Sequence, residues 1–145
     1  MVKPGRRVFF DTWGWLAIAH RDDQRHEQVT AYYRDFILSG GIPVTSDYIL
    51  SETVTLLRLR TTAKGAAAFI DGLLTGVRAG KIQLLRVTEE RWNAAWQLSK
   101  KFADKPDISF VDLTSFTLMK ELRISEALTA DRHYELIGMG FRKLF

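Results

Sequence analysis

Cysteine is absent from the sequence, which has 145 residues and only three prolines. Its absence excludes disulfide bonds, thiolate zinc sites and a cysteine nucleophile, and it is typical of a reducing compartment. A long apolar run is also lacking, since none approaches the roughly 18 residues that a membrane-spanning helix needs. The basic stretch from Met1 to Arg7 leads into an apolar run that is too short for a secretory signal. We therefore expect a cytoplasmic protein with no membrane association.

The residues that are present have the composition of an ordinary globular domain. Hydrophobic residues make up 46% of the chain and charged residues 26%, which are common proportions for soluble proteins. Because 145 residues is also a common domain length, residues 1–145 are expected to form one domain. The net charge of +4 weakly favours a polyanionic partner such as nucleic acid.

Short β-rich runs alternate with longer helical patterns along the chain. Strands are predicted at 8–10, 42–45, 82–87, 127–130 and 141–144. Helices are predicted at 13–20, 25–38, 48–60, 63–77 and 89–102, and from Asp107 or Ser109 to Leu122. This alternation predicts an α/β fold in which helices cover both faces of a parallel sheet. In such folds, ligands bind beyond the carboxyl ends of the strands.

Four acidic residues stand where a folded chain disfavours a charge. Asp11 and Asp131 directly follow predicted strands, and Glu52 and Asp112 interrupt the apolar faces of predicted helices. Two carboxylates about 4 Å apart repel each other by roughly 4 kcal/mol at an effective dielectric constant near 20. A cluster of them therefore binds protons or holds a cation, and Mg²⁺ and Mn²⁺ prefer oxygen ligands. The alternative is that each acid lies at the rim of a buried face and reaches water.

The two helical acids occupy specific positions on their helical wheels. Glu52 falls within an apolar arc, between Leu56 and Leu59, with the polar residues of that helix on the opposite side. Asp112 shares an apolar face with Ser115, one turn further on. The Ser115 hydroxyl is therefore a candidate auxiliary group beside Asp112.

The segments around these acids have a characteristic order. They are VFFDTWGWLA at 8–17, Asp23 with His26, SET at 51–53, DISFVD at 107–112 and LTADRHY at 128–134, followed by Gly140 and Phe141. In this order they resemble the PIN-domain ribonucleases, particularly the VapC toxins of toxin–antitoxin pairs. The likeness extends over almost the whole chain and is strongest from Asp107 to Phe141.

The resemblance implies a three-layer α/β/α sandwich around a parallel sheet and metal-dependent endoribonuclease activity. It also implies one or two Mg²⁺ or Mn²⁺ ions, an RNA substrate, a cognate antitoxin protein and a homodimer. The residues that it implies for the site are the metal ligands Asp11, Glu52, Asp112 and Asp131 and the auxiliary groups Thr12 and Asp107.

Other functions fit parts of the same pattern. A non-catalytic PIN module would bind RNA or a protein partner without cleaving either. A phosphoacceptor receiver domain is also α/β and binds Mg²⁺, but it carries an acid pair after its first strand, where this chain has Asp11 followed by Thr12. A zinc site needs several converging donors, and His133 is far in sequence from His20 and His26.

Two apolar features also allow more than one interpretation. Trp92 and Trp96 are one helical turn apart, which fits a core or interface pair or a platform for stacking bases. The apolar stripe at 66–77 fits a core face, a homodimer face or an antitoxin groove.

Overall fold

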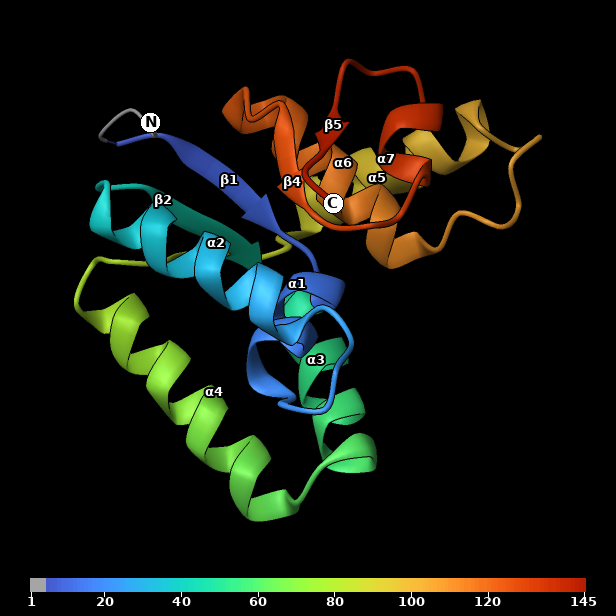
Figure 1. Cartoon of the computed structure of the whole chain (residues 1–145). Helices are drawn as coiled ribbons and strands as arrows, with labels where there is room; N and C mark the ends of the chain where they lie inside the picture. The colour runs from blue at the N-terminus through green and yellow to red at the C-terminus, as the bar shows by residue number, and fades with distance from the viewer. Residues whose placement is uncertain (1–4) are drawn as a thin grey trace.

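Within residues 5–145, which the computed structural model describes, five parallel strands form one sheet (Figure 1). They are β1 (Arg7–Phe10), β2 (Ile42–Ser46), β3 (Gln83–Leu85), β4 (Glu126–Leu128) and β5 (Arg142–Lys143). Their order in the sheet is β3-β2-β1-β4-β5, and every neighbouring pair is parallel. The parallel sheet predicted from the sequence is confirmed. Met1 to Pro4, part of the basic N-terminal stretch, lie outside the described residues.

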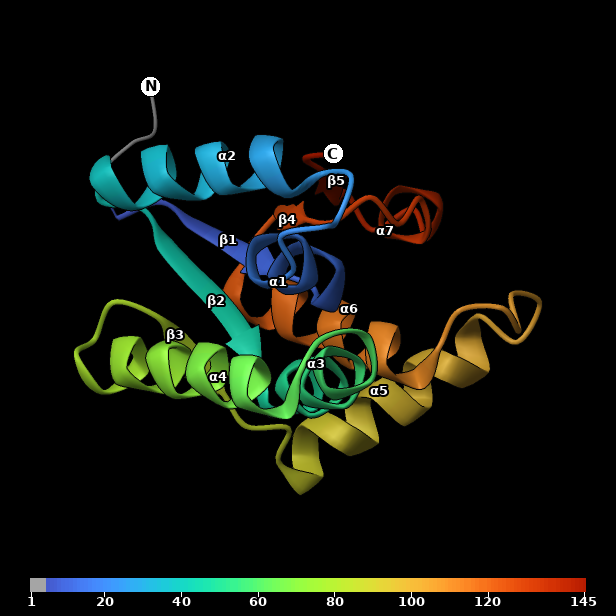
Figure 2. The same ribbon diagram turned by 60° about the horizontal axis from the view of Figure 1, so that its bottom comes forward.

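Helices cover both faces of this sheet. They are α1 (Thr12–Ala19), α2 (His26–Leu38), α3 (Asp47–Arg60), α4 (Ala63–Arg78), α5 (Glu89–Lys101), α6 (Phe110–Leu122) and α7 (His133–Leu136). Right-handed connections from β1 through β2 to β3 place α2 and α4 on one face, with β2 in view between them (Figure 2). The return from β3 to β4 places α5 and α6 on the other face. The three-layer α/β/α prediction is therefore confirmed.

Helix boundaries follow the capping residues of the sequence. Ser46 caps α3, since its side chain accepts a hydrogen bond from the Ile49 amide at 3.1 Å. Ser109 caps α6 in the same way, accepting from the Asp112 amide at 3.1 Å. Gly40, just after α2, has a φ of 83°, a conformation that glycine adopts without steric cost. These contacts fix where α3 and α6 begin, and with them the positions of Glu52 and Asp112.

Strand β1 is the centre of the core. Val8, Phe9 and Phe10 are completely buried, because helices cover both faces of this central strand. Phe10 packs against Trp15 of α1 and Phe36 of α2, with ring centroids 4.8 and 5.9 Å apart. The first acid, Asp11, thus follows a strand that is held rigidly from both sides.

A glycine lets α1 approach strand β4. A Cβ atom on Gly14 would lie 2.9 Å from the Leu128 carbonyl oxygen, closer than real Cβ contacts. Since α1 begins directly after Asp11, this close approach places the start of α1 against the end of β4.

The structure corrects several details of the sequence-based predictions. Strand β3 is shorter than the predicted strand at 82–87, and helix α7 was not predicted. Leu59 was expected on the apolar arc of its helix, yet its side chain is 76% exposed because no other element covers that part of α3. Trp92 and Trp96 are 39% and 46% exposed, so they are not core residues. No helix in the described part of the chain is long and apolar enough to cross a membrane.

Candidate metal centre

Two of the four acids lie at the adjacent carboxyl ends of β1 and β4. Phe10 pairs with Leu128 in the sheet, and the Asp11 amide donates to the Leu128 carbonyl oxygen at 3.3 Å. The Thr129 hydroxyl donates to Asp11 Oδ2 at 2.8 Å and accepts from the Asp131 amide at 3.1 Å. One hydroxyl therefore connects the carboxylate of Asp11 to the backbone of Asp131.

The other two acids come from helices beyond the strand ends. Asp112 lies in the first turn of α6 and is partly buried. Glu52 lies in α3, which contacts α6, and it lines an open hollow with Ser51, Thr55 and Val111 among others. The helical wheel placed Ser51 and Thr55 opposite Glu52, whereas they border the same hollow. The placement was wrong because, at 100° per residue, Thr55 lies only about 60° and Ser51 about 100° from Glu52 around the helix.

The pKa values show that the four acids share one electrostatic environment. Burial raises the pKa of Asp11 to about 6, and the charges of Glu52 and Asp131 add to the increase. Hydrogen bonds from the Thr129 hydroxyl and the Thr12 backbone amide partly offset it. Burial likewise raises the pKa of Asp112 to about 7, and the charges of Asp11, Asp131 and Glu52 add to the increase.

Charges raise the pKa of a carboxyl group in this way where they lie close to it in a poorly hydrated space. These effects on Asp11 and Asp112 are those of acids that come from two strand ends and two helices.

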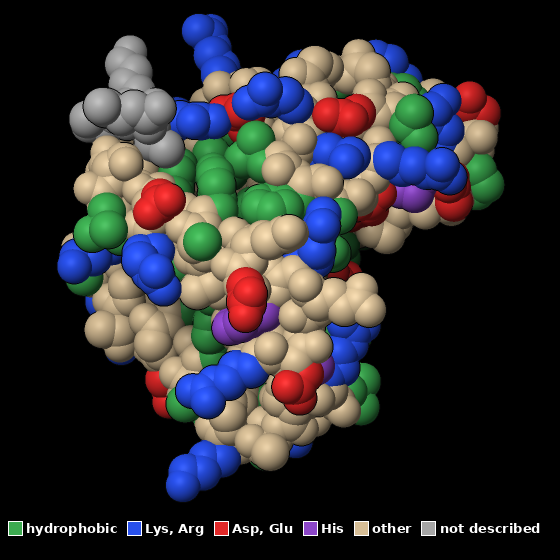
Figure 3. Space-filling view, viewed as in Figure 1, with side chains coloured by type: hydrophobic (Ala, Val, Ile, Leu, Met, Phe, Trp, Pro, Cys, Tyr) green, Lys and Arg blue, Asp and Glu red, His purple; other side chains and the backbone are tan. Residues whose placement is uncertain are grey.

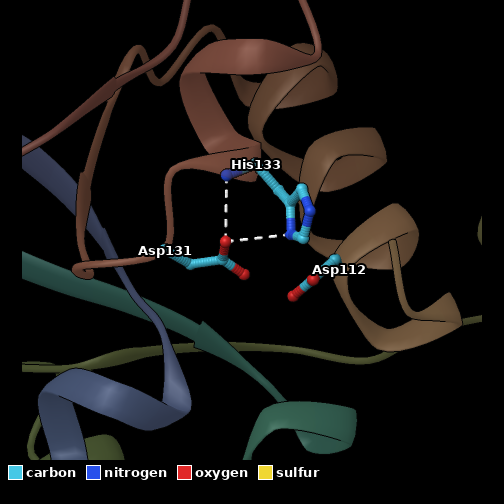
Figure 4. A group of neighbouring side chains, drawn as sticks. All are labelled: Asp112, Asp131 and His133. Carbon is cyan, nitrogen blue, oxygen red and sulfur yellow. Dashed lines mark hydrogen bonds and ion pairs between the residues drawn. The ribbon is translucent and has the colours of Figure 1, made fainter. Parts of the chain in front are cut away.

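A histidine joins this group from the first position of α7 (Figure 4). Asp131 Oδ1 accepts a hydrogen bond from the His133 amide at 2.9 Å and lies 3.0 Å from His133 Nδ1. The other ring nitrogen, Nε2, lies 2.8 Å from Asp107 Oδ2. Asp112, Asp131 and His133 each offer one ligand atom within 4.8 Å of the other two. Asp11 and Glu52 are not part of this closer triad.

The hydrogen bond with Asp107 is the largest cause that raises the pKa of the His133 imidazole, and the charge of Asp131 adds to it. Asp107 was expected to be an extra acid of the cluster. It instead has a side chain that is 70% exposed and is paired with the histidine.

The remaining auxiliary residues differ in what they offer. Thr12 is buried, and its hydroxyl has no hydrogen-bond partner among residues 5–145. Ser115 is completely buried and donates to the Val111 carbonyl oxygen at 3.2 Å, so its hydroxyl already bonds within α6. Tyr134 is also completely buried, and burial, followed by the charges of Asp11 and Asp112, raises its pKa well above its ordinary value.

This donor set fits a divalent cation. Asp11 and Asp112 have carboxyl groups whose charge is unfavourable in the protein alone, and a bound cation would compensate that charge. The unpartnered Thr12 hydroxyl beside Asp11 adds a neutral oxygen donor. Carboxylate and hydroxyl oxygens suit Mg²⁺ and Mn²⁺, and an imidazole nitrogen also suits transition metals.

Comparison with known proteins identifies the family. The PIN domain pattern matches residues 8–138 of the chain. The chain belongs to the PIN domain family. The resemblance inferred from the acid-bearing segments is confirmed.

Named relatives of this PIN domain include the 23S rRNA-specific endonuclease VapC20 of Mycobacterium tuberculosis, found in two strains. Each is 29% identical over 131 residues, which cover 90% of this chain and 94% of the relative. The crystal structure of VapC20, described as a Sarcin-Ricin loop cleaving toxin, matches with a TM-score of 0.76 and 27% identity, covering 90% of this chain and 95% of that one.

A more distant match is VapBC2 from Rickettsia felis, bound to a DNA fragment from their promoter. Its TM-score is 0.71 at 9% identity, covering 94% of this chain and 96% of the other. At that identity the match shows a shared fold. VapC20 and VapBC2 thus have the fold described for this PIN domain.

Sequence reasoning missed two residues that organise this PIN domain site, Thr129 and His133. The spacing of Asp131 and His133 contained a usable signal, because an Asp side chain often accepts from the amide two residues later. No such local signal marked the contact between His133 and Asp107, which are 26 residues apart.

Proposed function

We propose that this PIN domain is an endoribonuclease that depends on a divalent metal, and that it is the toxin of a toxin–antitoxin pair. The observation that supports the proposal most directly is that the charges of Glu52 and Asp131 raise the pKa of Asp11, and that these two charges together with Asp11 raise the pKa of Asp112. The likeness to a relative named as an rRNA-specific endonuclease, over 90% of this chain, supports RNA as the substrate.

In this proposal, Asp11, Glu52, Asp112 and Asp131 hold one or two Mg²⁺ or Mn²⁺ ions. The chemistry that such an ion supplies when bound is Lewis acidity, which activates water and stabilises charge on the phosphoryl oxygens. The chain provides the rigidity that this chemistry needs. The Thr129 hydroxyl fixes the Asp11 carboxylate, and the start of α6 is fixed by its cap.

A cleavage assay with ribosomal RNA and an unrelated RNA tests this function. We expect the purified chain to cleave RNA with Mg²⁺ or Mn²⁺ and to lose the activity in EDTA. Asp112→Asn should abolish cleavage while leaving the fold intact. Glu89→Gln is the matched control, since it neutralises an exposed acid in the first turn of α5, and it should cleave normally.

Two results would contradict the proposal in different ways. Cleavage by Asp112→Asn at the wild-type rate would exclude catalysis by the acid cluster. The absence of cleavage by the wild type with either ion would instead favour a non-catalytic PIN module that binds RNA or a protein.

For the antitoxin, the proposed docking site is the apolar groove between α2 and α4. The groove is lined by Tyr33 and Ile37 of α2 and by Phe69 and Leu73 of α4, with Trp15 also contributing. An amphipathic segment of an antitoxin would cover these side chains. Co-purification of the product of a neighbouring small gene tests this partner, and light scattering of the isolated chain tests the proposed homodimer.

The charge distribution adds little to the choice of substrate. Lys and Arg side chains are spread over the face drawn in Figure 3 and do not gather into one patch. The net charge of +4 is therefore a weaker argument for RNA than the acid cluster.

A further inference from the structure

His133 is a donor at the metal centre that the four-acid pattern does not contain. Its ring lies between two carboxylates, with Nδ1 3.0 Å from Asp131 Oδ1 and Nε2 2.8 Å from Asp107 Oδ2. Figure 4 shows the ring beside Asp131 with the Asp112 carboxylate close by. The ring is thus held at both nitrogens, although only the nitrogen on the Asp131 side faces the acid cluster.

The contact with Asp107 determines which nitrogen is available to a metal. Histidines that ligate metals almost always donate their second ring N–H to a carboxylate, a carbonyl or water, which fixes the orientation of the ring. Asp107 Oδ2 is in position to accept from Nε2. That arrangement leaves Nδ1 as the ligand atom, on the side of Asp131 and Asp112.

The separations suit a single ion. With metal–ligand bonds of about 2.1 Å, ligand atoms around an octahedral ion lie roughly 3–4 Å apart. The three ligand atoms of Asp112, Asp131 and His133 lie within 4.8 Å of one another, so a small closing movement brings them to bonding distance. Thr12 adds an independent sign of a polar ligand at this centre, because its buried hydroxyl, next to Asp11 in the chain, has no hydrogen-bond partner among the described residues.

We propose that His133 supplies Nδ1 as a nitrogen ligand to an ion held by Asp112 and Asp131, and that Asp107 is the positioning residue that aims the ring. The proposal rests on the proposed metal-dependent function and adds to it a preference among ions. Mg²⁺ strongly prefers oxygen ligands, whereas transition ions accept imidazole nitrogen readily. The site therefore favours Mn²⁺ over Mg²⁺.

The competing role for His133 is purely structural. Its amide and Nδ1 both contact Asp131 Oδ1. In the structural role, His133 holds the Asp131 carboxylate in place and does not contact the ion. The two roles differ in one measurable property, since only a ligand nitrogen has a direct magnetic coupling to bound Mn²⁺.

Pulsed electron paramagnetic resonance of Mn²⁺ bound to the untagged full chain tests the proposal. The chain has three histidines, so the nitrogen signal is readily assigned. We expect a ¹⁴N coupling in the wild type that changes to a ¹⁵N coupling when histidine is labelled with ¹⁵N. His133→Ala should remove the coupling, and His20→Gln, the control histidine variant, should retain it. The labelling experiment needs no variant, so a folding defect in His133→Ala leaves the test intact.

Titration of Mn²⁺ and Mg²⁺ gives the second measurement. We expect His133→Ala and Asp107→Asn to lower Mn²⁺ affinity by about 10–100-fold and Mg²⁺ affinity by less. Bound Mn²⁺ without histidine nitrogen coupling in the wild type would overturn the proposal, while continued RNA cleavage in the same preparation would leave the proposed function standing. A wild type that binds neither ion would overturn both.

Discussion

Removing one charge from the acid cluster should stabilise the metal-free protein. The variant is Asp112→Asn, chosen because the pKa of Asp112 is raised from 3.8 to about 7, mainly by burial and then by the charges of Asp11, Asp131 and Glu52. A difference of that size corresponds to roughly 4 kcal/mol of unfavourable free energy for the ionised carboxylate, at about 1.4 kcal/mol per pKa unit. Asparagine has no charge but remains a partly buried polar group.

The expected gain is therefore smaller than the full cost of the charge. The first turn of α6 loses an acid that interacts favourably with the helix N-terminus, worth about 0.3–1 kcal/mol. We expect a net stabilisation of about 2 kcal/mol at pH 8, which is a rise in melting temperature of roughly 4–8 °C for a domain of this size.

The effect has a defined pH dependence. The folded protein binds a proton at Asp112 near pH 7, whereas the unfolded chain does so near pH 3.8. The metal-free wild type therefore gains stability as the pH falls from 8 to 5, because only the folded state takes up that proton. Asp112→Asn should show a smaller gain over this range, with the remainder due to Asp11, whose pKa is about 6.

Thermal unfolding in EDTA, followed by circular dichroism at pH 8 and pH 5, measures both effects. The matched control is Glu89→Gln, which removes an exposed first-turn acid of α5 and should change the melting temperature by little. If Asp112→Asn melts at or below the wild-type temperature at pH 8, the idea that repulsion and burial strain this cluster is wrong.

Three further outcomes are expected. Mn²⁺ at about 100 times its dissociation constant should stabilise the wild type by about 2.7 kcal/mol, and a melting curve indifferent to Mn²⁺ contradicts this. In Gly14→Ala, the added Cβ would lie 2.9 Å from the Leu128 carbonyl oxygen. This variant should lower the free energy of unfolding by about 1–3 kcal/mol, measured by denaturant unfolding, and should also weaken Mn²⁺ binding. Unchanged stability argues against the close contact. Glu126→Gln weakens the ion pairs with Arg6 and Arg142 and should cost about 1 kcal/mol at pH 7 without affecting RNA cleavage. Burial raises the pKa of Glu126, but hydrogen bonds from the two arginines lower it below its ordinary 4.5 on balance. The stability difference should therefore be full above about pH 4.5 and be lost only as the pH falls through that lowered pKa; a difference that is already absent at about pH 6 contradicts the assignment.

The order of strands and helices could be predicted from the sequence because local signals mark it. Ser109, one of the two predicted starts of its helix, caps α6. Ser46 caps α3 close to the predicted start at residue 48, and Gly40, with its positive φ, follows the predicted helix end at residue 38. The four acids could also be singled out, since two follow predicted strands and two interrupt the apolar faces of helices. The rule that ligands bind at the carboxyl edge of a parallel sheet related Asp11 to Asp131, whereas the placement of Glu52 and Asp112 beside them required the fold.

The remaining features depend on contacts between distant segments. The exposure of Leu59 shows that a helical wheel identifies an apolar arc but not which part of it another element covers. The contact between His133 and Asp107 joins α7 to the turn before α6. No periodicity encodes such a contact, because it arises only when β4 and α6 have taken their places.

The hydroxyl of Thr129 has a consequence for when the protein first becomes active. It connects Asp11 with Asp131, two residues that are neighbours in space but separated by most of the polypeptide. A chain still under synthesis holds Asp11 long before β4 exists to dock beside it. In the proposed nuclease, the full set of ligands is therefore assembled only near the end of translation.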